Sequence, residues 1–422
     1  MWKYRCKTQL IALGVAFLSG VVLMGAALFT NTSTYILGEM PADMAAFVAG
    51  NKFLLCASGG FLLAGIVNVI LISQLLMVQY NISPFLLYIL MFIAPTYLIL
   101  AGTFLVIPMV ILSIYGIWSL RSGRSRAFRQ ANISGDEEIL RIYELHHKLD
   151  PEYKAMAEEC RRNYDKARWV MALGVVACIC VIFFIQSLMV VMLAIVLYMF
   201  IFNYLARLQV NTFIPITKLL YEKCDPEACV SAIIYFSTRR GKLRLTNQSL
   251  MAQCLIYMND PSLAQDVLIT YQRKDSASVL TYWSLMSYIY YLQKDEQGLQ
   301  RCYEEAQKVR LSYGQTGVMI RSEELQAIKN RIDLMNGDFN TCKQYFLKIV
   351  KTSPFPFQKA DASYYIGLIS FVEQDYPIAR MYFNQTITLG NKLYFVRNAR
   401  NYLDKIEAMH LDEDEDMTYQ LQ

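Results

Sequence analysis

The side chains best suited to chemistry in this sequence are three histidines and ten cysteines, and their spacing fits neither a metal site nor a reactive site. His146 and His147 are adjacent, so on a helix they point to different faces and cannot chelate one metal as an i, i+4 pair would. The C-terminal half holds five cysteines at no zinc or redox spacing: Cys224, Cys229, Cys254, Cys302 and Cys342. In a reducing cytoplasm these residues serve as small apolar side chains.

Sequence patterns for the common catalytic sites are also missing. The chain has no Gly-Lys-Ser/Thr phosphate loop, no Gly-rich dinucleotide turn and no nucleophile elbow. We therefore expect a protein that is not an enzyme and that uses no cofactor and no metal.

A short pattern recurs five times in the C-terminal half: an acidic helix-breaking residue, a mostly small residue four positions later and a large residue eight positions later. The acids are Asp225, Asp260, Asp295, Asp338 and Asp375, the next set is Cys229, Ala264, Leu299, Cys342 and Ala379, and the large residues are Ile233, Leu268, Tyr303, Phe346 and Phe383. Successive acids are 35, 35, 43 and 37 residues apart, which is the range of a helical-hairpin repeat. A small residue facing a large one lets two helices approach closely.

A second small residue is expected eight positions before each acid. Ala252, Ser287 and Gly367 satisfy this, Thr217 does so loosely and Asn330 does not. The fifth unit is the most complete, with Gly367, Asp375, Tyr376, Ala379, Tyr382 and Phe383. The pattern resembles the tetratricopeptide repeat (TPR) over about residues 206–408. The first unit departs from it, because Pro215 would kink the first helix.

The TPR resemblance implies a right-handed superhelix with a concave groove that binds peptides or partner proteins. If the first helix of each unit faces the groove as in that family, the lining comprises Ser284, Tyr288, Tyr291, Arg331, Met335, Tyr364, Leu368 and Phe371. Such an aromatic, weakly charged surface suits an amphipathic helix or an extended apolar segment. One alternative is that half of these residues are buried against neighbouring repeats, and another is an ordinary all-α domain.

The N-terminal half has the composition of a membrane domain. Over the whole chain 55% of residues are hydrophobic, more than a soluble globule usually holds. Four runs without a charged side chain reach the length of about 20 residues that crosses a hydrocarbon core: Thr8–Thr30, Phe53–Gln79, Phe85–Leu120 and Trp169–Leu205. The last two are too long for one crossing, so we expect hairpins with bends near Ala101–Thr103 and Gln186–Ser187. The prediction is six spans, with four as the alternative.

Basic residues near the spans set the expected orientation, because Lys and Arg are retained on the cytoplasmic side. Lys3, Arg5 and Lys7 put the N-terminus inside, and arginines at both ends of residues 121–168 put that segment inside. We therefore expect an integral protein of the cell membrane with a cytoplasmic N-terminus and repeat domain. A cleaved signal peptide is the alternative for the first run, although its apolar stretch is longer than a signal core.

The expected organisation has five parts. Residues 1–120 form four transmembrane helices, 121–168 a cytoplasmic helical loop, 169–205 a transmembrane hairpin, 206–410 the TPR-like domain and 411–422 an acidic disordered tail. For the loop a solvated helix is favoured, and docking against the repeats is the alternative.

Two further observations narrow the expected function. The spans hold no Asp, Glu, Lys, Arg or His, which an ion or proton transporter would need. Asn68 and Gln74 are expected to make interhelical hydrogen bonds or to lie at an interface. The repeat half is near neutral, so nucleic acid is not an expected partner. The sequence favours a scaffold or adaptor, integral in membrane lipid, whose repeats bind an unknown partner protein. The alternative is an accessory subunit of a membrane transport or export complex.

Overall fold

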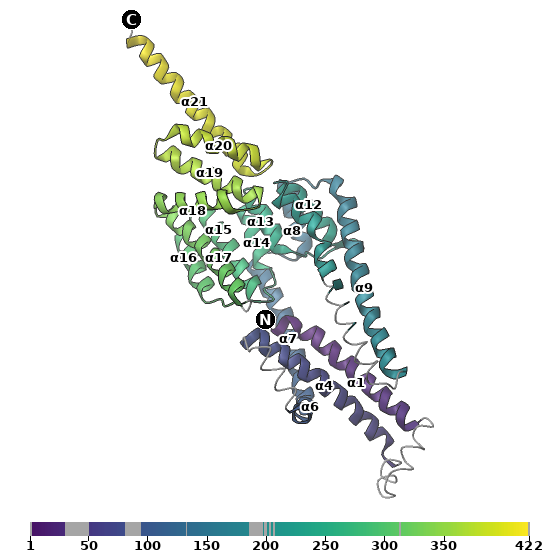
Figure 1. The fold of residues 1–422 in the computed structure, drawn as a ribbon. Helices are drawn as coiled ribbons and strands as arrows, with labels where there is room; N and C mark the ends of the chain where they lie inside the picture. The colour runs from purple at the N-terminus through teal and green to yellow at the C-terminus, as the bar shows by residue number, and fades with distance from the viewer. Residues whose placement is uncertain are drawn as a thin grey trace. The chain divides into compact units, whose positions relative to one another are not determined.

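Helices make up nearly all the regular structure of the chain, which confirms the all-α fold class (Figure 1). The computed structural model describes residues 2–29, 50–80, 94–131, 133–184, 197, 201, 204–205, 207–311 and 314–420. Within these ranges the only strands are β1 (Thr238–Arg239) and β2 (Lys242–Leu243), which pair antiparallel. The chain forms two compact units: an N-terminal unit of Met1–Arg126 with two short later segments, and a C-terminal unit of the remaining residues.

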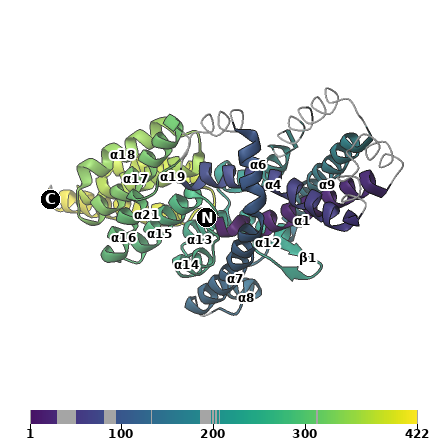
Figure 2. The ribbon, with the colours of Figure 1, turned by 90° about the horizontal axis from the view of Figure 1, so that it is seen from below.

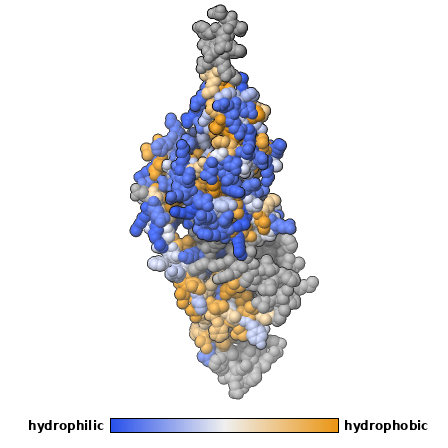
Figure 3. All heavy atoms as spheres, turned by 90° about the vertical axis from the view of Figure 1, so that its left-hand side faces the viewer, coloured by the Kyte–Doolittle hydropathy of each residue, from blue (hydrophilic) through white to orange (hydrophobic). Residues whose placement is uncertain are grey.

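The N-terminal unit contains three helices that are long and apolar enough to cross a membrane, within the described residues. They are α1 (Cys6–Phe29), α4 (Lys52–Tyr80) and α7 (Val106–Gln130), and the short helices η1 (Trp2–Arg5) and α6 (Pro95–Phe104) accompany them. On the face that Figure 3 shows, the described surface of this unit is mostly hydrophobic, whereas that of the C-terminal unit is mostly hydrophilic. Most of the fourth apolar run lies outside the described residues, so the six-span count stays a prediction.

Helices α1 and α4 pack in antiparallel orientation through glycines. The rings of Phe29 and Phe53 are 6.0 Å apart and those of Phe17 and Phe61 are 5.1 Å apart. A Cβ on Gly20 would lie 2.4 Å from the carbonyl oxygen of Gly59, so only glycine fits at this crossing. Close packing of small residues is the usual means by which helices associate in lipid.

Helix α6 packs on the middle of α4 in the same way. A Cβ on Gly102 would lie 2.5 Å from the carbonyl oxygen of Gly65. The buried Asn68 side chain donates a hydrogen bond of 2.9 Å to the carbonyl oxygen of Gly102. This bond between helices confirms the expected role of Asn68.

The predicted hairpin bend at Ala101–Thr103 is wrong, because these residues lie inside α6. The helix break falls at Leu105, between α6 and α7. Pro108 explains its place, since a proline cannot donate to the carbonyl four residues earlier and its ring clashes with that carbonyl. Helical hydrogen bonds continue from Leu105 to Ala101 and from Met109 to Leu105, both at 3.0 Å, so the break is a kink. The second predicted bend, Gln186–Ser187, lies outside the described residues.

The start of α1 and the end of α7 lie at one end of the N-terminal unit. The Lys3 ammonium donates a hydrogen bond of 2.9 Å to the Ser119 hydroxyl. The basic residues of the N-terminus and those that follow Leu120 in α7 therefore gather at the same end. This clustering is the arrangement that the positive-inside rule expects of one membrane face.

The C-terminal unit consists mainly of consecutive helices joined by short corners. Figures 1 and 2 show them side by side, from teal α12 to yellow-green α20. They are α8 (Asp136–His146), η2 (Pro151–Tyr153), α9 (Lys154–Phe184), α11 (Ile214–Tyr221), α12 (Pro226–Ser237), α13 (Gln248–Tyr257), α14 (Pro261–Ile269), α15 (Ser276–Leu292), α16 (Glu296–Gln307), α17 (Gly314–Met335), α18 (Phe339–Thr352), α19 (Pro356–Val372), α20 (Tyr376–Gly390) and α21 (Tyr394–Gln420).

The five recurrent aspartates all occupy the same position, at the N-terminal cap of the second helix of a pair. Each side chain accepts a hydrogen bond from the backbone N–H three residues later, on Ala228, Leu263, Gly298, Thr341 and Ile378. The residue before each aspartate has a positive φ: Cys224, Asn259, Lys294, Gly337 and Gln374. Each aspartate N–H also bonds back to the preceding helix at 2.8–2.9 Å, as at the end of a Schellman motif.

The small and large positions of the pattern pack as their sizes require. The residues four positions after the aspartates are at most 1% exposed. A Cβ on Gly367 would lie 2.7 Å from the Phe383 ring, so the fifth pair needs glycine there. Of the large residues Tyr303 alone is only partly buried. The predicted kink at Pro215 is wrong, because this proline lies in the first turn of α11, where its missing N–H costs nothing.

Residues 127–168 are not the solvated loop that the sequence favours; they pack on the first two helix pairs. Ile139 and Tyr143, one turn apart on α8, are fully buried. The Asp150 N–H donates to the Ser231 hydroxyl at 3.0 Å, and the Arg161 guanidinium donates to the Tyr235 carbonyl at 3.3 Å. The apolar face of α8 therefore finds its partner within the C-terminal unit.

The first and fifth pairs meet at what we call the closing contact, between Lys223–Asp225 and Asn391–Lys392. The Asn391 amide donates to the Lys223 carbonyl at 2.8 Å, and the Lys392 ammonium lies 2.7 Å from the Asp225 carboxylate. Nearby, the rings of Tyr221 and Phe357 stack at 5.1 Å. An open superhelical groove would keep its two ends apart, so this unit differs from the shape that the resemblance implies.

The acidic tail also differs from expectation. The structure continues α21 through the acids 412–416 to Gln420, where the sequence predicts disorder. No glycine or proline follows Tyr394 to end the helix.

Candidate functional site

The C-terminal unit contains a partly open cavity of about 670 Å³. Residues of α13, α15, α17, α18 and α19 line it, together with Tyr221 of α11. Its aromatic lining is Tyr221, Tyr257, Tyr288, Tyr291, Tyr345, Phe346, Phe355, Phe357 and Tyr365. Polar and charged side chains, among them Gln253, Glu323 and Asn330, share the lining with these rings. The volume is large enough for a small ligand or a side-chain anchor of a peptide.

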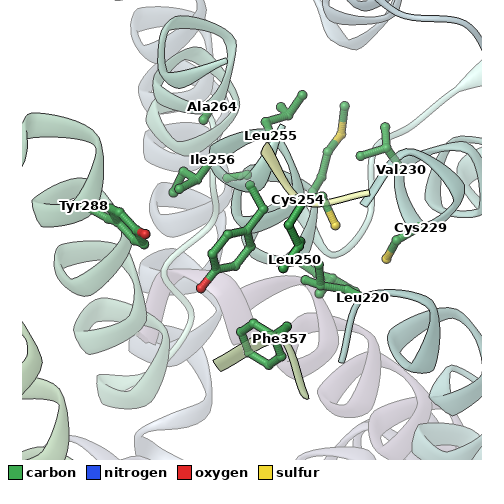
Figure 4. Close-up of a cluster of buried hydrophobic side chains, with 14 of the residues drawn as sticks. Leu220, Cys229, Val230, Leu250, Cys254, Leu255, Ile256, Ala264, Tyr288 and Phe357 are labelled. Carbon is green, nitrogen blue, oxygen red and sulfur yellow. The ribbon is translucent and has the colours of Figure 1, made fainter. Parts of the chain in front are cut away.

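The apolar core beside the cavity is densely packed. Figure 4 shows Tyr288 and Phe357 reaching toward a cluster that includes Leu250, Cys254 and Leu255. The centre of the Tyr257 ring lies 5.5 Å from that of Phe357 and 6.0 Å from that of Tyr288, and both pairs meet edge to face. These contacts fix the cavity walls in place.

Asp361 of α19 is a largely buried carboxylate in this cavity. Its Oδ1 accepts a hydrogen bond of 2.9 Å from the Tyr288 hydroxyl. Burial raises the pKa of Asp361 to about 7, against the smaller opposing effects of the Tyr288 hydrogen bond and the Arg331 charge. Within the described part of the chain, no basic side chain forms an ion pair with it.

Arg331 of α17 forms its hydrogen bonds with α15, and its charge opposes the rise in the pKa of Asp361. Its guanidinium donates to the Ser287 hydroxyl at 2.8 Å and to the Ser284 carbonyl at 3.4 Å. It also lies over the Tyr288 ring, 4.6 Å from the ring centre, a favourable cation–π geometry. The positive charge in the cavity is thus fixed against α15.

The cavity phenols are neutral at physiological pH. Burial raises the pKa of Tyr221, Tyr291 and Tyr345 to about 12 in each case. They therefore offer hydroxyl donors and ring faces rather than a base, and the site is suited to binding.

The structure brings half of the predicted groove residues to this cavity. Ser284, Tyr288, Tyr291 and Arg331 line it, whereas Met335 is partly buried outside its lining.

The other three predicted groove residues lie on a different face of α19. Tyr364 lies 5.0 Å from the Phe395 ring and Phe371 lies 5.0 Å from the Tyr402 ring, both on α21. Leu368 is partly buried on the same helix. These three positions match the alternative of burial between neighbouring helices.

Sequence reasoning missed the face of α19 that does line the cavity. That face is Phe357, Asp361 and Tyr365, spaced four residues apart. The predicted face, beginning at Tyr364, is rotated from it by one residue, or about 100° of helix. The sequence does contain a signal for this face, because Asp361 lies between two aromatic residues at i−4 and i+4, as a polar group within a lining would.

No cluster of potential metal ligands occurs among the described residues. Comparison with protein-family models finds no match, and comparisons with curated proteins and with solved structures likewise find no significant match. The interpretation of the cavity and of the corners therefore depends on the structure of this chain alone.

Proposed function

We propose that this chain is a membrane-anchored scaffold whose C-terminal, TPR-like helix pairs bind a segment of a partner protein. The observation that carries the proposal is the aromatic cavity bounded by α13, α15, α17, α18 and α19. Consecutive pairs with equivalent corners support the TPR-like interpretation, since a shared corner geometry repeats one packing solution along the chain.

Binding would depend on anchors that enter a cavity already formed. Edge-on aromatic contacts and the Arg331 hydrogen bonds hold the walls before any ligand arrives. A rigid site avoids the entropy that a flexible loop loses on binding. Large side chains of the partner would supply most of the affinity, as at other interfaces.

The proposed location is the cytoplasmic face of the cell membrane. Three apolar helices of the N-terminal unit support membrane insertion. The hydrogen bond between Lys3 and Ser119 brings the basic residues near the start of α1 and the end of α7 to one end of the unit. Such a concentration of basic charge supports a cytoplasmic location for that end.

Photo-crosslinking from the cavity rim tests the proposal. A photoreactive residue would replace the exposed cavity residue Lys348 in the full chain, with a matched one at the exposed Arg397 of α21. We expect one protein to crosslink from position 348 and not from 397, and Ala327→Trp, which fills the cavity, to abolish it. Lys329→Trp, on the exposed side of the same helix, should leave it intact.

The same experiment separates the accessory-subunit alternative. A photoreactive residue at the exposed Leu18 of α1 would report a membrane-protein neighbour. Crosslinks to an integral membrane protein from position 18, with none from 348, would favour the transport or export complex and contradict the scaffold.

A further inference from the structure

The Asp361 carboxylate is chemically unusual within the cavity. Its Oδ1 has the Tyr288 hydroxyl as partner, and no described residue donates a hydrogen bond to its Oδ2. A largely buried carboxylate normally acquires a cationic partner or several donors. The Arg331 guanidinium in the same lining donates to the Ser287 hydroxyl and the Ser284 carbonyl of α15.

The surroundings of this carboxylate suit a cation. Tyr257, Tyr288 and Tyr365 line the cavity with it, and the Tyr288 hydroxyl donates to its Oδ1. Aromatic faces attract ammonium and guanidinium groups, most strongly where water is excluded. Glu323 and Glu324 at α17 add negative charge to the lining, which holds only Arg331 and Lys348 as basic residues.

We infer that the cavity binds a ligand carrying an ammonium or guanidinium group on an apolar stem, with the cationic group paired to Asp361. This inference deepens the proposed function and rests on it where the source is a partner's Lys or Arg side chain. A small organic amine would present the same chemistry. In either case the apolar stem would lie against the tyrosine rings.

Calorimetric titration of the full chain in mild detergent tests the inference. The probes are phenethylamine, with 2-phenylethanol as its neutral analogue, and an acetylated Leu-Lys-Leu amide, with norleucine in place of the lysine as its neutral analogue. We expect the charged member of at least one pair to bind about tenfold or more tightly than the neutral one. Peptide binding would identify a partner's side chain as the source, and phenethylamine binding alone would identify a small amine.

Two variants tie the binding to the carboxylate. Asp361→Asn should weaken the charged probe about tenfold or more and leave its neutral analogue unchanged. Glu323→Gln is the matched control, because it removes one negative charge from an exposed residue of the same cavity. It should change affinity less than about threefold.

The pH dependence gives a second readout. Affinity for the charged probe should rise from pH 6 to pH 8 as Asp361 ionises, and the rise should be absent in Asp361→Asn. Burial keeps the pKa of Tyr257, Tyr288, Tyr365 and Tyr394 well above this range. Arginine stays charged throughout it, so Arg331 contributes no such rise.

Some outcomes overturn the inference. Equal binding of charged and neutral probes, no binding of either charged probe, or unchanged binding by Asp361→Asn would each do so. A partner that still crosslinks from position 348 would then leave the proposed scaffold function standing.

Discussion

At the residue scale, one aspartate at each corner performs two tasks at once. Its N–H closes the preceding helix and its carboxylate caps the next one, as for Asp375 with Ser370 and Ile378. The residue before it must adopt a left-handed conformation, which is a strain for any residue except glycine. Gly337 meets that requirement without strain and Asn259 with little, since asparagine also tolerates this region. The corner geometry is thus fixed by hydrogen bonds that are strong enough to hold Cys224, Asn259, Lys294 and Gln374 in it.

Loss of one cap should produce a measurable but modest loss of stability. Asp375→Ala removes the acceptor for the Ile378 N–H, and we expect the free energy of unfolding to fall by about 1 kcal/mol. Asp375→Asn is the control, since asparagine caps equally well. Denaturant unfolding followed by far-UV circular dichroism measures both, and equal losses in the two variants would contradict the capping role.

The buried carboxylate makes a separate prediction with a definite sign. The pKa of Asp361 is raised from its ordinary value near 4 to about 7 by burial. The folded state therefore binds more protons than the unfolded state between these values, and stability falls as pH rises from about 4 to about 7. The full loss is of the order of 4 kcal/mol.

Asp361→Asn should remove that loss. We expect the variant to be more stable than the wild-type chain at pH 8 and similar to it at pH 4, measured by denaturant unfolding at both values. A gain in stability with a loss of binding is typical of a functional site. Equal pH profiles for the two proteins would show that Asp361 carries no buried charge.

At the element scale, the recurring acids predict the starts of five helices because a cap is a local interaction. The small residues at Ala264, Ala379 and Gly367 likewise predict buried contacts. Helix orientation is not local, and the lining face of α19 differs from the predicted one by a single residue. The bend in the third apolar run was misplaced because small residues were preferred over the proline: the helix breaks at Leu105, in the turn before Pro108.

The docking of residues 127–168 can be tested on α8. Tyr143→Ala removes a fully buried aromatic ring, and we expect a loss of about 3–5 kcal/mol in the free energy of unfolding. Leu145→Ala, two residues away and 78% exposed, should change stability by less than about 0.5 kcal/mol. If α8 were a solvated loop helix, the two substitutions would have similar small effects.

A second element-scale prediction concerns the crossing of α1 and α4. Gly20→Ala would place a methyl group 2.4 Å from the Gly59 carbonyl oxygen, and a backbone oxygen cannot move aside as a flexible side chain could. Gly14, by contrast, has open space around it. We expect Gly20→Ala to lower the melting temperature in detergent by several degrees, and Gly14→Ala to leave it unchanged. Equal melting temperatures would show that the two helices do not cross there.

At the scale of the whole C-terminal unit, the closing contact determines what kind of site the helix pairs can form. It joins Asn391 to the carbonyl of Lys223, which is 168 residues earlier in the chain. The sequence pattern cannot predict such a contact. Whether the first and fifth helix pairs meet depends on how far each successive pair is rotated relative to the one before. The aromatic groove inferred from helix spacing is thus a partly open cavity, and three of its eight expected lining residues pack between neighbouring helices instead.

The most direct measurement of this arrangement is disulfide trapping across the closing contact. Lys223→Cys combined with Asn391→Cys would place two thiols on the neighbouring backbone segments that the Asn391 amide now joins by its 2.8 Å hydrogen bond to the Lys223 backbone carbonyl. We predict that mild oxidation of the full chain, in a Cys224→Ser background because Cys224 is a native free thiol in this contact, gives a fast-migrating crosslinked species on a non-reducing gel for the double variant and for neither single variant. Failure to form it in a folded protein would indicate an open array and contradict the closing contact that bounds the binding cavity.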